Sequence, residues 1–279
     1  MGHGNRMRSS QTNLPQAILC MDLDGTLVDE QVRLHPNDVD ILSHFPKNIL
    51  PVIATGRDLQ SVKSILQENG LYLNMPFPLA GVYMNGGVTY LPGEVICQTK
   101  TFSPQARQAV ISLADSFPRT AFTFFGVNQV YLVNPNPFGR EVGQMHHFTL
   151  QETDLTGLPD EIVKVMVVES DPNLMIKVKQ SSQGLPATMA TSLAYTYEIN
   201  PLGINKADGL LRLLKTLHLD GIPIFAAGDA ENDLCLFAAA HTSFAPTTAY
   251  PQVMEQADQL ITRDQAGLLT HILKHIQLL

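Results

Sequence analysis

The segment Asp22-Leu23-Asp24-Gly25-Thr26 comes directly after a short apolar run, Ala17-Ile18-Leu19-Cys20-Met21. Apolar residues that follow one another without alternation are typical of a strand covered on both faces, as in a parallel sheet. Side chains two residues apart along a strand point to the same side, so we expect Asp22 and Asp24 to face one site where the strand ends. Gly25 allows the backbone to turn sharply there. The segment therefore predicts a buried strand that carries two carboxylates at its carboxyl end.

Two further apolar runs lead into polar residues in the same way. Residues 49–54 run into Thr55-Gly56-Arg57, and residues 222–227 run into Gly228-Asp229. Apolar residues at helical spacing follow the first of these runs and also follow Lys206. Strand–helix alternation at both ends of the chain predicts an α/β fold with a Rossmann-like parallel-sheet core. Ligands bind such sheets beyond the carboxyl ends of the strands, so these polar segments are expected to meet at one edge.

The middle of the chain has a different pattern. Shorter strand-like pieces, such as residues 129–133 and 162–168, are divided by turn-forming stretches such as Asn134-Pro135-Asn136-Pro137. Strand–helix alternation resumes only near Ile199. We therefore expect an α+β domain inserted into the core. The predicted boundaries are residues 1–86 and 196–279 for the core and residues 87–195 for the insert.

The composition is that of a well-packed protein with an acidic balance. The chain has 279 residues, of which 44% are hydrophobic and 16% charged, and its formal net charge is −8. This charge gives no electrostatic reason to expect binding to nucleic acid or to an anionic membrane. No apolar run is long enough to span a bilayer, and no signal peptide is visible. We therefore expect a cytoplasmic protein, with its three separated cysteines reduced.

The carboxylates at the strand ends suggest chemistry. Two carboxylates after an apolar strand are costly unless a cation or protons compensate, and one could be a nucleophile while the other moves a proton. A solvated Asp-Gly turn is the alternative. The segment Gly228-Asp229-Ala230-Glu231-Asn232-Asp233 makes that alternative weaker, because Asp229 can complete a Mg²⁺ site with Asp22. Asn232 and Asp233 are also candidates to cap the helix that follows.

Thr55-Gly56-Arg57 and Lys206 are candidates for binding an anion. A hydroxyl and exposed backbone amides at a strand-to-helix junction can bind phosphate oxygens. Arg57 either grips an anionic substrate or covers the surface. Lys206 stands at the start of a predicted helix, where the helix dipole disfavours a cation, so its position calls for a local anion. An exposed surface lysine is the alternative.

Taken together, these segments resemble the four motifs of the haloacid dehalogenase-like hydrolase superfamily, in its Cof-type branch. The pattern D-x-D-G-T, a strand ending in Thr-Gly-Arg, a lysine, and G-D-x-x-N-D occurs in the expected order. The resemblance covers both core segments, and the insert matches a C2-type cap in position and approximate size. It implies a magnesium-dependent phosphatase that hydrolyses a small phosphate ester, such as a sugar phosphate or a phosphorylated cofactor.

The resemblance also implies a role for each matched residue. Asp22 is expected to be the nucleophile that forms an aspartyl-phosphate, and Asp24 to protonate the leaving oxygen and then activate water. Mg²⁺ is expected to be held by Asp22, the backbone carbonyl of Asp24 and Asp229, and Asp233 to support these ligands from behind. Thr55 and Lys206 are expected to bind the transferring phosphoryl group. Further contacts with the substrate are expected from Gly56, Arg57, Asn85, Gly86 and Asn232.

Two stretches depart from the pattern of the branch. Asn85-Gly86-Gly87 resembles the Asn-Gly-Ala near the cap entrance, but its third residue is glycine, and a simple turn is the alternative. After the last motif the branch commonly has Gly-Asn-Ala, whereas this chain has Pro246-Thr247-Thr248-Ala249. The second departure removes no residue that the chemical steps require, but it puts a close substrate analogy in that loop in doubt.

Other readings of the same motifs stay open at this point. A phosphomutase or other phosphotransferase would use the same core, because Asp24 as acid and base serves either acceptor. A non-catalytic protein that binds a phosphorylated ligand is a third possibility. In the insert, Arg140, His146 and His147 are candidates to contact the leaving group, with surface or core roles as the alternative. The sequence does not predict the oligomeric state.

Overall fold

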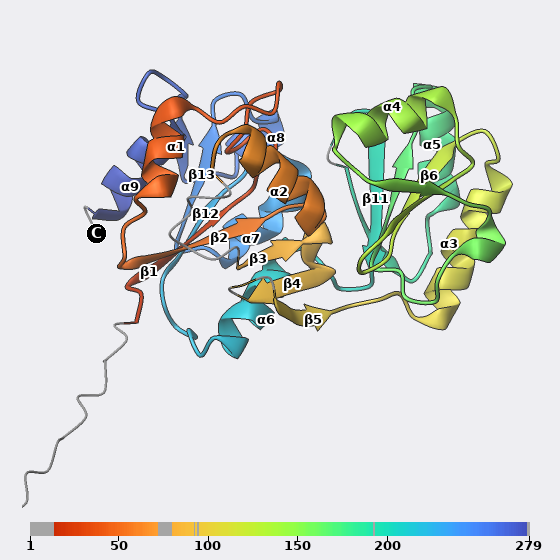
Figure 1. The fold of residues 1–279 in the computed structure, drawn as a ribbon, viewed down its shortest axis with the longest axis horizontal. Coiled ribbons are helices and arrows are strands. Elements are labelled where there is room, and N and C mark those ends of the chain that lie inside the picture. The colour runs from red at the N-terminus through yellow and green to blue at the C-terminus, as the bar shows by residue number, and fades with distance from the viewer. Residues whose placement is uncertain (1–13, 72–79, 92, 94, 192, 278–279) are drawn as a thin grey trace, which may run out of the picture.

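The computed structural model describes residues 14–71, 80–91, 93, 95–191 and 193–277, and its strands form two separate sheets (Figure 1). The larger sheet has eight strands in the order β14-β13-β12-β1-β2-β3-β4-β5. The strands from β14 to β3 run parallel, and β4 and β5 extend the sheet in antiparallel pairs. The bounds are β1 Ala17–Met21, β2 Ile49–Ala54, β3 Gly81–Tyr83, β4 Val88–Leu91, β5 Val95–Thr99, β12 Ile224–Ala227, β13 Thr242–Pro246 and β14 Gln259–Ile261.

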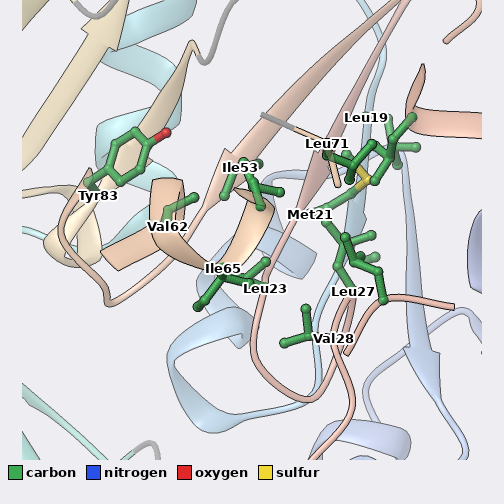
Figure 2. Packing of buried hydrophobic residues seen from close by; sticks show 14 of the residues in the cluster. Leu19, Met21, Leu23, Leu27, Val28, Ile53, Val62, Ile65, Leu71 and Tyr83 are labelled. Carbon is green, nitrogen blue, oxygen red and sulfur yellow. The ribbon is translucent and has the colours of Figure 1, made fainter. Parts of the chain in front are cut away.

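Helices cover both faces of this sheet, which explains why its central strands are apolar throughout. In β1, Leu19 and Met21 belong to a buried cluster that includes residues of α1, α2 and α9, and Figure 2 shows part of this cluster. Ile18 and Cys20 point to the other face and pack with residues of α6 and α7. The core helices are α1 Pro36–Ser43, α2 Leu59–Glu68, α6 Lys206–Thr216, α7 Leu234–Ala239, α8 Pro251–Met254 and α9 Leu268–Gln277. The predicted parallel-sheet core is confirmed.

The smaller sheet has six strands in the order β10-β11-β9-β6-β7-β8 and is antiparallel except between β7 and β8. Residues of α3 and α5 share a buried cluster with one face of this sheet, and Val142 of α4 packs on the other. We call this unit the cap. Its elements are α3 Pro104–Ser116, β6 Ala121–Phe125, β7 Val130–Val133, α4 Pro137–Met145, β8 Leu150–Glu152, β9 Lys164–Val168, α5 Pro172–Ser181, β10 Ala187–Ala190 and β11 Thr196–Pro201.

The two sheets do not divide where the sequence predicted. β4 and β5 fall inside the predicted insert, residues 87–195, yet they pair with the core sheet. β11 falls inside the predicted core segment, residues 196–279, yet it pairs with β9 and β10 of the cap. The core sheet continues through antiparallel strands, which breaks the strand–helix alternation, and β11 is buried along its whole length like a parallel core strand. The sheets therefore group β6 to β11 together and leave β4 and β5 with the core strands.

The cysteines and the lengths of the helices bear on two further expectations. All three cysteines are free thiols. Among the residues that the structure describes, no helix combines the length and the apolar character that crossing a bilayer requires.

Candidate active site

The carboxyl ends of three neighbouring core strands are level with one another. Met21, the last residue of β1, is paired with Ile53 of β2 on one side and with Ala227 of β12 on the other. The residues that follow these strands therefore meet at one sheet edge, as expected for ligand sites in open α/β sheets. Asp22 follows β1 directly, Thr55 follows β2, and Asp229 comes two residues after β12.

Lys206 joins two carboxylates beneath this edge. Its Nζ lies 2.5 Å from Asp22 Oδ1 and 2.7 Å from Asp233 Oδ1, and its side chain is only 1% exposed. Burial opposes the cation, but the two carboxylates outweigh it and hold the pKa of Lys206 above its ordinary value. The alternative of an exposed surface lysine is therefore wrong. The anion that a cation at this helix start requires is supplied by Asp22 and Asp233.

Asp233 supports the site through both of its oxygens. Oδ1 accepts from Lys206, while Oδ2 accepts from the backbone N–H of Asp229 at 3.0 Å and of Ala230 at 3.1 Å. These bonds fix the loop between β12 and the 3-10 helix η3, Glu231–Asp233. Because its oxygens are already engaged, Asp233 orients Lys206 and Asp229 from behind.

Asp22, Asp229 and Asp233 form an acidic cluster whose oxygens lie within 4.8 Å of one another. Burial raises the pKa of Asp22 well above its usual range, and burial followed by the nearby Asp233 raises the pKa of Asp229 to about 7. Crowded carboxylates of this kind become ionised when a cation compensates them. An all-oxygen donor set is the one that Mg²⁺ prefers, so these residues fit a magnesium site.

Gly25 lies against the same acidic cluster, which leaves no room for a side chain there. Its φ of +73° lies in the left-handed region, and a Cβ at this position would collide with the carboxylate of Asp229. Thr26 Oγ1 donates to Asp229 Oδ1 at 3.2 Å. The Gly25-Thr26 turn after β1 therefore both admits and orients the Asp229 carboxylate.

Two donors of the Thr55-Gly56-Arg57 loop have no acceptor among the residues that the structure describes. The Thr55 carbonyl accepts from the N–H of Asn85 at 3.0 Å, and a trans peptide then directs the Gly56 N–H the opposite way. This N–H has no acceptor among the described residues. Thr55 Oγ1 accepts from the Arg57 N–H at 3.1 Å, which leaves the hydroxyl proton free to donate. With Lys206, these donors form a candidate anion site at the sheet edge.

Arg57 holds the carboxylate of Asp24 with two nitrogens. Nε lies 2.7 Å from Oδ2 and Nη2 lies 2.7 Å from Oδ1. The Arg57 side chain is 4% exposed, whereas Asp24 is 39% exposed. Burial opposes the charged carboxylate, but the guanidinium outweighs it and keeps the pKa of Asp24 below its ordinary value. Arg57 thus neither covers the surface nor extends free toward a ligand in this arrangement.

Asn85 and Gly86 lie on the short helix η1, Met84–Gly86, beside the anion site. Asn85 Nδ2 donates to Glu198 Oε2 at 2.6 Å, and its Oδ1 accepts from Asn232 Nδ2 at 3.2 Å. Gly86 has a φ of +97°, and a Cβ there would collide with the carbonyl oxygen of Asn205. Gly86 therefore lets η1 approach the residue that precedes Lys206, and Asn85 links two other side chains.

Two buried cap residues beside this loop were missed by the sequence analysis. Lys164 of β9 donates to the Gly56 carbonyl at 2.8 Å and forms an ion pair with Glu198 of β11. Lys164 is 1% exposed and Glu198 3%. A signal was present for Lys164, which is the one charged residue of the otherwise apolar residues 162–168, where an unpaired charge is costly. Glu198 gave no such signal, because its strand also contains Thr196 and Asn200.

The three cap residues singled out in the sequence have different surroundings. The carbonyl oxygen of His146 accepts from Arg57 Nη1 at 2.6 Å and from the Ser61 hydroxyl. His147 Nδ1 lies 3.5 Å from Glu68 Oε1 of α2. Arg140 pairs with Glu152 of the cap itself, and both side chains are about half exposed, at 46%. Of the three, only His146 contacts the Asp24–Arg57 pair.

The chain matches a known protein family over most of its length. The family model of the haloacid dehalogenase-like hydrolases matches residues 19–272. The chain belongs to this family. The family predicted from the sequence motifs is therefore confirmed, and the protein is an enzyme of the hydrolase class.

Individual relatives of the haloacid dehalogenase-like hydrolase are distant but similar over most of their length. An uncharacterized hydrolase of Schizosaccharomyces pombe is 28% identical and covers 94% of this chain and 90% of its own. A phosphoglycolate phosphatase of Natronomonas pharaonis is 27% identical, with coverage of 87% and 89%. A solved sugar phosphatase of subclass IIB has a TM-score of 0.80 at 18% identity and covers 94% of this chain and 99% of its own. The last comparison shows that the fold is shared.

Proposed function

We propose that this hydrolase is a magnesium-dependent phosphatase that acts on the phosphate monoester of a small metabolite, a sugar phosphate or a phosphorylated cofactor. The observation that carries the proposal is Lys206, whose Nζ bridges Asp22 and Asp233 beside the free donors of Thr55 and Gly56. This arrangement presents a carboxylate nucleophile next to an anion site. Relatives named phosphoglycolate phosphatase and a fold neighbour named sugar phosphatase support the same reaction.

In the first step, the Asp22 carboxylate attacks phosphorus and the bond to the leaving oxygen breaks, with Asp24 donating a proton to that oxygen. In the second step, the Asp24 carboxylate takes a proton from water, and the resulting oxygen attacks the aspartyl-phosphate and releases Asp22 and inorganic phosphate. Thr55, Gly56 and Lys206 hold the phosphoryl oxygens in place throughout. Mg²⁺, held by Asp22, the Asp24 carbonyl and Asp229, would neutralise part of the phosphate charge.

The contact between Arg57 and Asp24 affects the protonation state of Asp24 in the two steps. It favours the carboxylate form of Asp24, which the second step needs, over the acid form that the first step needs. A leaving group that departs without a proton avoids this requirement. Aryl phosphates are therefore expected to be good substrates in the first step, and alkyl phosphates to depend more strongly on Asp24 as an acid.

Phosphoryl transfer to a second hydroxyl would use the same residues, and no contact among the described residues favours it. The proposal is tested by measuring phosphate release from a panel of monoesters, with Mg²⁺ and with a chelator. We expect turnover of at least one small phosphate ester that stops on chelation and returns when Mg²⁺ is added. Turnover that persists in the chelator would contradict the metal requirement, and the absence of turnover across the panel would contradict the phosphatase.

A further inference from the structure

The backbone conformation of residue 56 does not require a glycine. Its φ lies outside the left-handed region, so any residue could adopt it. A Cβ at this position would instead lie 3.1 Å from Lys164 Nζ and 3.2 Å from both Asn85 Oδ1 and Glu198 Oε1. Two of these three atoms belong to the cap. The close approach of the cap therefore leaves little room for a side chain at residue 56.

Lys164 fixes one peptide plane of the anion-binding loop. The Gly56 carbonyl accepts from Lys164 Nζ at 2.8 Å, and the N–H on the other side of the same peptide donates to Thr55 Oγ1 at 3.1 Å. The peptide is therefore held from both sides, once from the core and once from the cap. This peptide connects the two free donors, Thr55 and Gly56, with Arg57, which grips Asp24.

Glu198 holds the opposite side of the same site. It accepts from Asn85 Nδ2 at 2.6 Å, and Asn85 Oδ1 accepts from Asn232 Nδ2 at 3.2 Å. Asn232 precedes Asp233, the residue that orients Lys206 and the Asp229 loop. Side-chain hydrogen bonds thus run without interruption from the cap to the loop that carries the acidic cluster.

We propose that Lys164 and Glu198 are a positioning pair through which the docked cap aligns the Thr55-Gly56-Arg57 loop and Asn85 around the substrate phosphate. The inference rests on the proposed phosphatase function for its kinetic consequence. Lys164 and Glu198 carry opposite charges and pair with each other, so they add no net charge to offset that of a phosphate. A buried ion pair is poor evidence for stability, because its desolvation cost is comparable with its Coulomb gain. Its bonds to Gly56 and Asn85 give it a geometric role instead.

The test compares a double variant with a matched control in the full chain. Lys164→Met/Glu198→Gln removes the pair without leaving a lone buried charge. Arg33→Met/Asp29→Asn removes an ion pair on the surface of the core domain, in which Arg33 is 67% exposed. For an aryl phosphate with Mg²⁺, we expect kcat of the first variant to fall about 10- to 100-fold while KM stays within about threefold, because alignment is lost and phosphate donors remain. The control is expected to match the wild type.

A second measurement tests the pair without relying on activity. Hydrogen–deuterium exchange of peptides covering residues 52–61 is expected to be faster in the double variant and unchanged in the control, because the Gly56–Arg57 peptide is no longer held by the cap. If the wild type proves inactive toward every phosphate ester, the proposed function fails, and the exchange comparison still decides the role of the pair. Lys164→Arg, which keeps a cationic donor, is expected to recover at least part of both signals.

Three outcomes would overturn the proposal. A large rise in KM with kcat unchanged would show that Lys164 or Glu198 binds the substrate directly. A lower melting temperature with unchanged kcat, KM and exchange would show that the pair only stabilises the cap. If the double variant does not fold, Lys164→Met carries the comparison, since it loses the bond to the Gly56 carbonyl and Glu198 can take up a proton once its cation is gone. Unchanged kcat and exchange in that variant would equally contradict the proposal.

Discussion

Arg57 binds both carboxylate oxygens of Asp24 at 2.7 Å, and its remaining nitrogen, Nη1, binds the backbone carbonyl of the cap residue His146 at 2.6 Å. The residue proposed to move protons is therefore held by a guanidinium that also contacts the cap. Bidentate contacts of this kind fix geometry as well as charge. Cap docking and the protonation of Asp24 are linked through one side chain.

This link predicts a shift in the pH dependence of turnover. Arg57 keeps the pKa of Asp24 below its ordinary value, so Arg57→Leu is expected to raise that pKa. With an aryl phosphate, whose leaving group needs no proton, the rate depends on the Asp24 carboxylate in the second step. The acid limb of kcat against pH should therefore move to higher pH. Arg33→Leu, which removes an exposed pair with Asp29, is the control, and an unmoved acid limb in Arg57→Leu would contradict the assignment.

His146 predicts a pH dependence of stability. Burial, with the nearby Arg57 cation, lowers its pKa from 6.5 to about 4 in the folded protein. Between pH 6.5 and pH 4 the unfolded chain binds a proton at this imidazole that the folded protein does not, so acidification favours unfolding. The loss for this partly buried side chain is on the order of 2 kcal/mol.

The variant His146→Gln isolates this effect. Its free energy of unfolding, from denaturant titrations at several pH values, should fall less steeply on acidification than that of the wild type. His44→Gln changes an exposed histidine on the surface of the core domain, and its unfolding free energy should depend on pH as that of the wild type does. Parallel curves for wild type and His146→Gln would show that His146 does not contribute.

The acidic cluster predicts a stabilising response to magnesium. In the absence of a cation, burial and Asp233 raise the pKa of Asp229 to about 7, so binding Mg²⁺ displaces a proton and should tighten as pH rises from 6 to 8. Saturation at about 100 times Kd corresponds to roughly 2.7 kcal/mol of added stability. Thermal melts with and without Mg²⁺ measure this response. Asp229→Asn should largely abolish it and the exposed Asp40→Asn should not, so a full response in Asp229→Asn would contradict the metal site.

An alanine substitution at Gly25 is expected to impair the metal site, whereas the same substitution at Gly221 is not. Gly25 and Gly221 have similar φ values, +73° and +82°, but a Cβ at Gly221 meets nothing within 4 Å, whereas one at Gly25 meets the Asp229 carboxylate. Gly221→Ala is therefore expected to cost about 1–2 kcal/mol of unfolding free energy from the backbone alone. Gly25→Ala should cost more and should also lose the response to Mg²⁺. Equal losses and equal Mg²⁺ responses in the two variants would contradict the close approach of Asp229.

The sequence was sufficient for the part of the site that lies directly on the strand ends. Asp22, Thr55 and Asp229 each follow an apolar run, and the rule that parallel strands share one ligand edge brings them together. Lys206 was singled out by its conflict with the helix dipole, although that signal alone favoured an exposed lysine and the expected role of Lys206 came from the resemblance to the family. These are local signals, each readable within a few residues of the motif.

The contacts of Arg57, Lys164 and Glu198 could not be predicted in the same way. Lys164 binds the carbonyl of Gly56, 108 positions away in the sequence, and Glu198 binds Asn85, 113 positions away. Such pairs depend on how the cap rests on the core, which no local pattern records. The sheet to which β11 belongs could not be predicted for a related reason, because β11 is buried along its whole length, as a core strand would be, although it pairs inside the cap.

The central claim, that Asp22 is the nucleophile of a magnesium-dependent phosphatase, is tested most directly by Asp22→Asn. The substitution keeps the size of the side chain and an oxygen that can accept from Lys206, but an amide does not attack phosphorus as a carboxylate does. Hydrolysis of an aryl phosphate is measured in Mg²⁺, with Asp40→Asn as a surface control and circular dichroism to show that both variants fold. We expect wild-type rates from the control and no detectable turnover from Asp22→Asn. Robust turnover by a folded Asp22→Asn protein would contradict the account.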